Sequence, residues 1–189
     1  MFAASIYPSG PRWGTALGAS DRGAVFLSYA SQDVAAARRI CAALRAGGIE
    51  VWFDQDNLSS GDPWDTSIRR QIRSCALFVP VVSSRTQARD EGYFRREWRL
   101  AADRSHDVAD GEPFLLPVTI DDVAPGEARV PTAFFGAHWT HLPDGEVPEA
   151  FVRRVRKLLA PGVVETLARS LALLRTALTA RIAFALGAA

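Results

Sequence analysis

A charge excess of either sign is missing from this chain: its 22 basic and 21 acidic residues leave a formal net charge of only +1. A protein that attracts nucleic acid through its overall field carries a strong basic excess. The near balance therefore argues against nucleic acid as a partner. Arginine supplies almost all of the basic residues, since Lys157 is the only lysine.

Cysteine is equally scarce. Cys41 and Cys75 are the only two, each lies in an apolar segment, and no CxxC pair occurs. This usage is typical of buried, reduced thiols in a cytoplasmic protein. His138 and His141 have no cysteine or third histidine beside them, so we expect no metal site. Residues 1–22 lack the basic start and continuous apolar stretch of a signal peptide, and we predict a loose leader there.

Motifs for several common active sites are also missing. No GxGxxG or GxxxxGK[ST] follows an apolar run, so neither a Rossmann-type dinucleotide site nor a P-loop is supported. No Gly-x-Ser-x-Gly elbow or Cys–His pairing indicates a covalent nucleophile. A phosphoacceptor domain would need acidic residues after its first and third strands, where this chain has Ser28-Tyr29 and Val82-Ser83.

Short apolar runs alternate with amphipathic segments from Ala24 onward. The runs predict strands, and the longer segments between them predict helices. Ser31 is expected to cap the first helix and Gly47-Gly48 to end it, while Asp62-Pro63 is a typical start for the second. Strands are predicted at 25–27, 49–53, 76–82, 114–120 and 137–142, and helices at 31–46, 62–74, 91–105 and 149–159.

Continuous apolar strands separated by helices predict a parallel sheet with helices on both faces. Five such strands indicate an α/β, flavodoxin-like fold with strand order 2-1-3-4-5. Sheets of this kind bind ligands beyond the carboxyl ends of strands 1 and 3, where the winding direction reverses. Ser28-Tyr29 and Ser83-Ser84 occupy those two positions, and a charged stretch, 85–91, follows the second.

Glu97 lies on the helix that follows this edge. Side chains three and four residues apart are neighbours on a helix. Here the neighbours of Glu97 are uncharged, so the carboxylate has no basic partner on its own helix. We therefore predict a partly exposed glutamate with a functional role, rather than an ordinary solvated helix residue. These neighbours are Tyr93, Phe94, Leu100 and Ala101.

Several segments, in the right order, resemble the conserved motifs of bacterial-type Toll/interleukin-1 receptor (TIR) domains. Residues 23–33 resemble the first conserved box, and 93–98 resemble the stretch that holds the third-helix glutamate. The resemblance covers about residues 22–160 and divides the chain into a leader (1–22), a TIR domain (23–160) and an apolar helical extension (161–189). The other matching segments are 48–54, 58–64, 83–84 and 116–118.

Many TIR domains cleave the nicotinamide–ribose bond of NAD⁺, and in these members the third-helix glutamate is essential. The resemblance implies that Glu97 is catalytic and that Tyr93, where the family usually has tryptophan, lines the nicotinamide pocket. NAD⁺ would be the substrate, and no cofactor or metal is expected. The expected substrate-binding residues are Ser28, Tyr29, Trp64, Ser83, Ser84 and Tyr93.

Alternatives remain for these residues and for the function. Tyr29 could pack in the core, Trp64 could anchor the second helix, and Ser83-Ser84 could simply end a strand. Other TIR domains are non-catalytic adaptors that act through TIR–TIR contacts. The first hypothesis is an NAD⁺ nucleosidase in signalling or antiphage defence, activated by homo-oligomeric assembly; the second is such an adaptor. The extension at 161–189 is expected to pack against another chain or a downstream domain.

Overall fold

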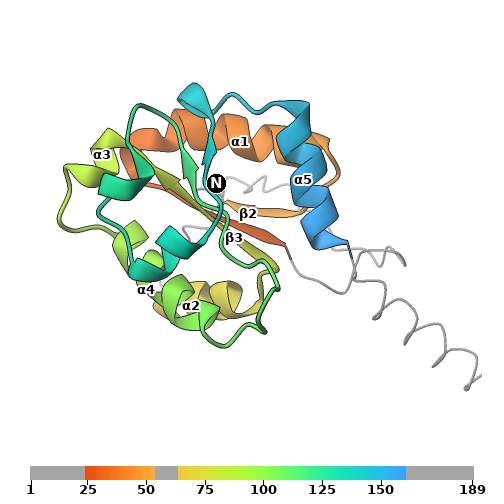
Figure 1. The fold of residues 1–189 in the computed structure, drawn as a ribbon, viewed down its shortest axis with the longest axis horizontal. Helices are drawn as coiled ribbons and strands as arrows, with labels where there is room; N and C mark the ends of the chain where they lie inside the picture. Colours follow the sequence, from red (N-terminus) through yellow and green to blue (C-terminus); the bar gives the residue numbers. More distant parts are fainter. Residues whose placement is uncertain (1–23, 54–63, 161–189) are drawn as a thin grey trace, which may run out of the picture.

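A five-stranded parallel sheet forms the centre of the molecule (Figure 1). The computed structural model describes residues 24–53 and 64–160. The observed order, β2-β1-β3-β4-β5, confirms the flavodoxin-like order predicted from the sequence. The strands are β1 (Val25–Ser28), β2 (Val51–Phe53), β3 (Leu77–Val82), β4 (Val118–Thr119) and β5 (Thr140–His141).

Helices cover both faces of the sheet, α1 and α5 on one side and α2 and α4 on the other (Figure 1). The α-helices are α1 (Val34–Ala46), α2 (Trp64–Ser74), α3 (Ser84–Gln87), α4 (Tyr93–Ser105) and α5 (Glu149–Leu159). Short 3₁₀ turns are η1 (Ser31–Asp33), η2 (Pro125–Glu127), η3 (Thr132–Gly136) and η4 (Pro143–Gly145). Among the described residues, no helix is long and apolar enough to cross a membrane.

Three predicted segments lie outside the described residues. They are the leader at 1–22, the loop at 54–61 with the Asp62-Pro63 helix start, and the extension at 161–189.

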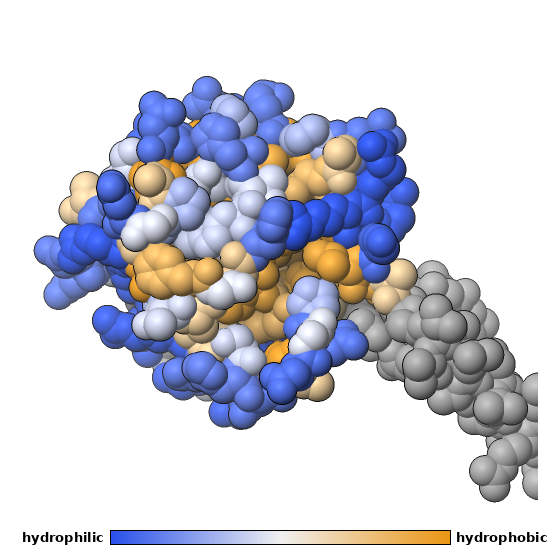
Figure 2. Space-filling model, in the orientation of Figure 1, coloured by the Kyte–Doolittle hydropathy of each residue, from blue (hydrophilic) through white to orange (hydrophobic). Residues whose placement is uncertain are grey.

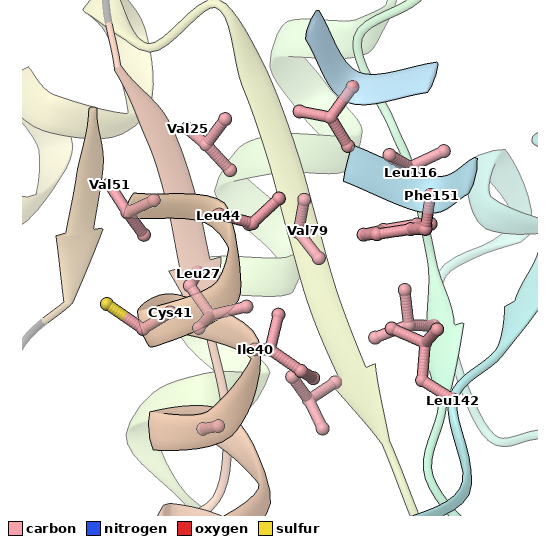
Figure 3. Close-up of a cluster of buried hydrophobic side chains, with 14 of the residues drawn as sticks. Val25, Leu27, Ile40, Cys41, Leu44, Val51, Val79, Leu116, Leu142 and Phe151 are labelled. Atoms are coloured by element: carbon pink, nitrogen blue, oxygen red, sulfur yellow. The ribbon is translucent and has the colours of Figure 1, made fainter. Parts of the chain in front are cut away.

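Side chains of β1 alternate between two apolar cores, as expected for a strand buried on both faces. Val25 and Leu27 join the core beneath α1 and α5 (Figure 3). Phe26 joins the core beneath α2 and α4, where its ring stacks on Phe78 of β3 with centroids 5.4 Å apart. The same alternation turns Ser28, the last residue of β1, toward α4.

Outside these cores the helices carry charge. The outward positions of α5 include Arg153, Arg156 and Lys157, all exposed, and the helix is strongly hydrophilic in Figure 2. Its inward positions, Phe151 and Val155, are buried in the core beneath α1. The charge pattern therefore fixes which face of α5 meets the sheet.

The last two strands are shorter than the predicted 114–120 and 137–142. The sequence predicted continuous strands, but the ladder between β3 and β4 is interrupted where Pro80 faces Pro117 in the register. Phe78 still donates its N–H to the carbonyl of Phe114, but Pro80 has no N–H to continue the ladder. Ordered pairing resumes only at Val118.

One predicted helix start was wrong, and one short helix was missed. Ser31 does not cap α1; it opens the η1 turn, and its hydroxyl donates to the side chain of Gln32 instead. The short helix α3 was not predicted, although Ser83 and Thr86 form a capping box at its start. A capping box satisfies two backbone N–H groups, which is why even one turn of helix is stable here.

Turn η4 approaches α1 so closely that it needs a glycine. Gly145 has a φ of 80°, and a Cβ at this position would lie 2.4 Å from the backbone oxygen of Ala36. Arg39 of α1 donates to the carbonyl of Asp144 in the same turn at 2.8 Å. This contact fixes the chain after β5 against the first helix.

We predict that Gly145→Ala destabilises the fold by more than about 2 kcal/mol, because it adds a clash to the strain of a positive φ. Gly111→Ala is the matched control, since Gly111 has a φ of 84° but no atom within 4 Å of the added Cβ. Urea unfolding of both variants measures the difference. Equal losses of stability would contradict the close approach.

Both cysteines are buried and reduced, as predicted. Burial raises the pKa of the Cys75 thiol to about 11, although the guanidinium of Arg104 opposes this shift. Arg104 donates to the carbonyl of Cys75 at 2.7 Å and lies 4.3 Å from the ring centroid of Phe114. The thiol therefore stays protonated at neutral pH.

This pKa predicts a loss of stability in alkaline solution. An unfolded cysteine loses its proton near the ordinary value of 9.0, whereas Cys75 in the folded chain holds it to about 11. The free energy of unfolding should therefore fall by about 2 kcal/mol as pH rises from 9 to 11. Urea unfolding at several pH values should show a shallower fall for Cys75→Ala. Identical slopes for the two proteins would contradict the prediction.

Candidate active site

Glu97 meets the end of β1 inside the molecule. The Ser28 hydroxyl donates a hydrogen bond to Oε2 of Glu97, with 2.5 Å between the oxygens. Only 1% of Ser28 and 6% of Glu97 are exposed. The expectation of a partly exposed glutamate was therefore wrong: this is a buried serine–carboxylate pair at the carboxyl end of a central strand.

The sequence of α4 explains the burial. Phe94, Glu97, Trp98 and Ala101 recur at helical spacing and are the positions that α4 turns into the protein. Phe94 and Trp98 pack edge to face with centroids 5.0 Å apart, and Trp98 also packs against Phe134. Of the uncharged neighbours named from the sequence, Phe94 and Ala101 are core residues on the same buried face of α4 as Glu97.

Burial gives this carboxylate an uncommon environment. A buried carboxylate costs considerable free energy unless hydrogen bonds compensate, and a hydrogen bond to a charged oxygen is stronger than a neutral one. A charge held in a partly dry site also acts more strongly on a neighbouring charge than it would in water. The pair thus presents a preoriented acidic group where β1 ends.

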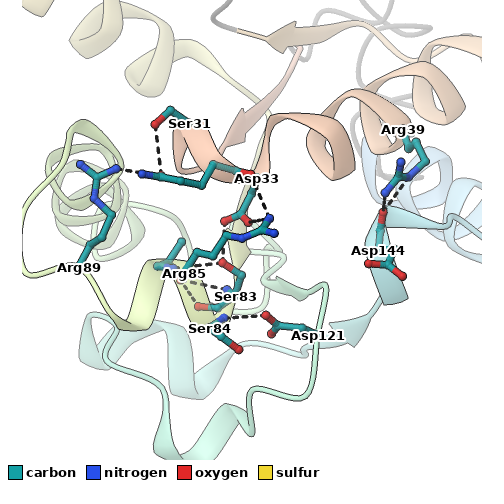
Figure 4. Close-up of polar contacts among 11 residues, drawn as sticks. Ser31, Asp33, Arg39, Ser83, Ser84, Arg85, Arg89, Asp121 and Asp144 are labelled. Atoms are coloured by element: carbon teal, nitrogen blue, oxygen red, sulfur yellow. Dashed lines mark hydrogen bonds and ion pairs between the residues drawn. The ribbon is translucent and has the colours of Figure 1, made fainter.

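A second serine–carboxylate pair, Ser83 with Asp33, lies at the carboxyl end of β3 (Figure 4). Ser83, directly after β3, donates to Oδ2 of Asp33 at 2.6 Å, and Asp33 is only 1% exposed. Arg85 of α3 donates to Oδ1 of Asp33 at 3.2 Å. This pair joins the start of α1 to the end of β3, the two elements that flank the point where the winding reverses.

Arg95 anchors the first turn of α4 to the segment after β3. It donates to the carbonyls of Thr86 at 2.8 Å and Arg89 at 2.9 Å, and also to that of Arg129. Its guanidinium lies over the ring of Trp98, 5.4 Å from the centroid. Burial lowers the pKa of Arg95, and the charge of Arg129 lowers it further. Arginine nevertheless remains charged in proteins.

The other residues predicted for the site do not form one cluster with Ser28 and Glu97. Tyr29 stacks on Phe53 with centroids 4.9 Å apart and packs against the core beneath α1, not the one that holds α4. Tyr93 is 59% exposed at the start of α4. The backbone N–H of Ser84 donates to Asp121, and the residue is exposed. Trp64 opens α2, and the prediction for its side chain falls outside what the structure describes.

Sequence reasoning missed Asp33 and Arg95. Asp33 belongs to the first conserved box, and its position five residues after Ser28 was a signal that it lies at the same edge. Arg95 had no signal, because its acceptors are backbone carbonyls from two other segments. In the described ranges, 24–53 and 64–160, no cluster of three His, Cys, Asp or Glu side chains is placed to hold a metal ion.

Comparison with known families matches residues 25–159 to the TIR domain. This chain belongs to the TIR domain family. The match covers the described fold from β1 to the end of α5, including both serine–carboxylate pairs. None of the curated proteins compared with the chain matches it.

Two solved structures of TIR-STING receptors share this fold. A metazoan TIR-STING receptor from C. gigas in complex with 2′,3′-cGAMP has a TM-score of 0.58 and 19% identity, covering 72% of this chain and 39% of that one. Another TIR-STING receptor structure from C. gigas has a TM-score of 0.55 and 16% identity, covering 79% of this chain and 44% of that one. The TIR domains of the activated Roq1 resistosome, which recognises the effector XopQ, match at 23% identity over 55% of this chain and 60% of that one, with a TM-score of 0.47.

This chain thus spans about two fifths of the TIR-STING receptor chains that it matches. At these identities the likeness establishes the fold, and the chemistry has to be argued from the site itself.

Proposed function

We propose that this TIR domain is an NAD⁺ nucleosidase, which cleaves the nicotinamide–ribose bond to give nicotinamide and ADP-ribose or a cyclic isomer. One observation carries the proposal: Glu97 is buried and held by Ser28 at the carboxyl end of β1. That position is next to the switch point between β1 and β3, where open α/β sheets bind their ligands.

A single carboxylate suffices for this reaction. Most glycosidases need one acid to protonate the leaving oxygen and a second carboxylate opposite it. Nicotinamide leaves a pyridinium as a neutral molecule and needs no proton. The remaining requirement is to stabilise the positive charge that develops on the ribose, and a preoriented carboxylate does this electrostatically. Glu97 has that role, as the catalytic residue.

Ser28 orients the carboxylate. Its hydroxyl fixes Oε2 of Glu97, so the carboxylate does not have to reorganise as charge develops on the ribose. Tyr93 lies one turn earlier on α4, and its exposed ring is suited to stack on nicotinamide. We retain Tyr29, Trp64, Ser83 and Ser84 as predicted substrate contacts; of these, Ser83 donates its hydroxyl to Asp33.

Homo-oligomeric assembly is the proposed route to activation, in a cytoplasmic signalling or antiphage role. Tyr93 and Phe135 are the large apolar side chains most exposed among the described residues, at 59% and 47%. Exposed aromatic rings are enriched in protein–protein contacts. This observation also favours the second candidate function, a non-catalytic adaptor that works through TIR–TIR contacts.

Replacing Glu97 separates the two functions. We predict that Glu97→Gln and Glu97→Ala each lower nicotinamide release from NAD⁺ at least about a hundredfold, because neither keeps the negative charge. Glu97→Gln should stay folded, since its amide oxygen still accepts the Ser28 hydroxyl. Glu97→Ala should lose about 1–3 kcal/mol of stability, because it leaves that buried hydroxyl without its acceptor. Chromatographic assay of nicotinamide and thermal unfolding measure both effects.

Glu127→Gln is the matched control, because Glu127 is an exposed glutamate in η2. It should release nicotinamide at the wild-type rate. Wild-type turnover in Glu97→Gln would refute the catalytic role. No release by the wild-type protein, even in its assembled form, would favour the adaptor.

Activity should also depend on concentration. If a neighbouring TIR domain completes the site, nicotinamide release per molecule should rise as dilute monomer is concentrated and begins to associate. Light scattering and the activity assay on the same samples test this together. A constant rate per molecule from a protein that remains monomeric throughout would contradict activation by assembly.

A further inference from the structure

Two arginines, Arg85 and Arg89 (Figure 4), both contact Gln32 at the edge of the sheet where β1 and β3 end. Arg85, in α3, donates from Nη1 to the backbone carbonyl of Gln32 at 3.0 Å. Arg89, just beyond α3, donates from Nη1 to the Oε1 of the same residue at 2.9 Å. Gln32 belongs to η1, the turn that leaves β1, so both guanidinium groups reach from the end of β3 to the end of β1.

Arg89 contacts both α4, which carries Glu97, and η1, the turn that follows Ser28. Its carbonyl accepts from Arg95, two residues before Glu97 on α4, while its guanidinium contacts Gln32. Gln32 is four residues after Ser28, so their Cα atoms are at most about 14 Å apart. Arg89 therefore places a cation at the same edge of the sheet as the Ser28–Glu97 pair.

The positive charge of Arg89 is not neutralised by the contacts that the described residues provide. Arg85 is paired with the carboxylate of Asp33, and Asp90 is paired with Arg129 at 2.6 Å. Arg89, in contrast, is bonded to the neutral amide of Gln32. A guanidinium has five N–H donors, and the contacts described for Arg85 and Arg89 use Nη1 alone, so both retain donors for an anion.

We propose that Arg89, assisted by Arg85, binds the diphosphate of the dinucleotide substrate. The inference rests on the proposed function. In NAD⁺ one ribose separates the diphosphate from the nicotinamide–ribose bond, which is cleaved beside Glu97 in that proposal. Guanidinium groups pair with phosphate oxygens through two parallel hydrogen bonds, which fixes orientation as well as position. Arg89 and Arg85 would thereby fix the position of the nicotinamide-bearing ribose relative to the carboxylate of Glu97.

Ligands with and without a diphosphate test this assignment. Isothermal titration of concentrated protein with ADP should show Arg89→Gln binding about tenfold or more weakly than wild type, because a charged hydrogen bond is lost. Nicotinamide riboside, which has no phosphate, should bind both proteins equally. Arg89→Lys should recover part of the affinity for ADP, and Arg85→Gln should have a smaller effect than Arg89→Gln.

Arg99→Gln is the matched control, because Arg99 is an exposed arginine on α4. It should bind ADP like wild type. Replacing Arg89 should leave the fold intact, since its guanidinium contacts an exposed glutamine, and thermal unfolding checks this. Equal ADP affinity in wild type and Arg89→Gln would overturn the assignment, as would a wild-type protein that does not bind ADP.

The two proposals fail in different ways. Glu97-dependent nicotinamide release with an unchanged KM in Arg89→Gln would uphold the nucleosidase and refute the diphosphate site. Arg89-dependent ADP binding without any nicotinamide release would uphold the diphosphate site and refute the nucleosidase.

Discussion

The hydrogen bond between Ser28 and Glu97 is the contact on which the proposed chemistry depends. It joins the last residue of the central strand β1 to the helix α4, across 69 residues of sequence. A buried carboxylate is tolerated in a protein only when its oxygens are hydrogen-bonded. The Ser28 bond helps to compensate for the burial of Glu97 and also fixes the orientation of its carboxylate, and the aromatic packing of Phe94 and Trp98 holds α4 in place around it.

The second pair, Ser83 with Asp33, ties the end of β3 to the start of α1 at the same edge of the sheet. Ser83 also forms the capping box of α3, so one side chain fixes both the start of α1 and the start of α3. Arg95 then attaches α4 to the end of α3 through backbone carbonyls. These contacts explain how a chain with little net charge assembles a localised anionic group and a localised cationic group at one sheet edge.

The sequence predicted much of this arrangement, since apolar runs mark every strand and the parallel order follows from them. It did not predict the burial of Glu97, because neighbours within a helix reveal only partners on that helix, whereas Ser28 comes from a distant strand. The interruption of the ladder before β4 could be predicted only from the strand register, which sets Pro80 opposite Pro117. Tyr29 illustrates the same limit: its position after β1 was predicted, but its stacking on Phe53 depends on the pairing of β1 with β2.

The central claim is that NAD⁺ binds where Glu97 meets β1. Nuclear magnetic resonance of isotopically labelled Glu97→Gln protein, which should bind NAD⁺ without cleaving it, tests this directly. The account predicts that added NAD⁺ shifts the backbone amide signals of residues 28–33 and 93–98, while those of α5 stay in place. Shifts confined to α5 or to the β5 edge, or no shifts at saturating NAD⁺, would contradict it.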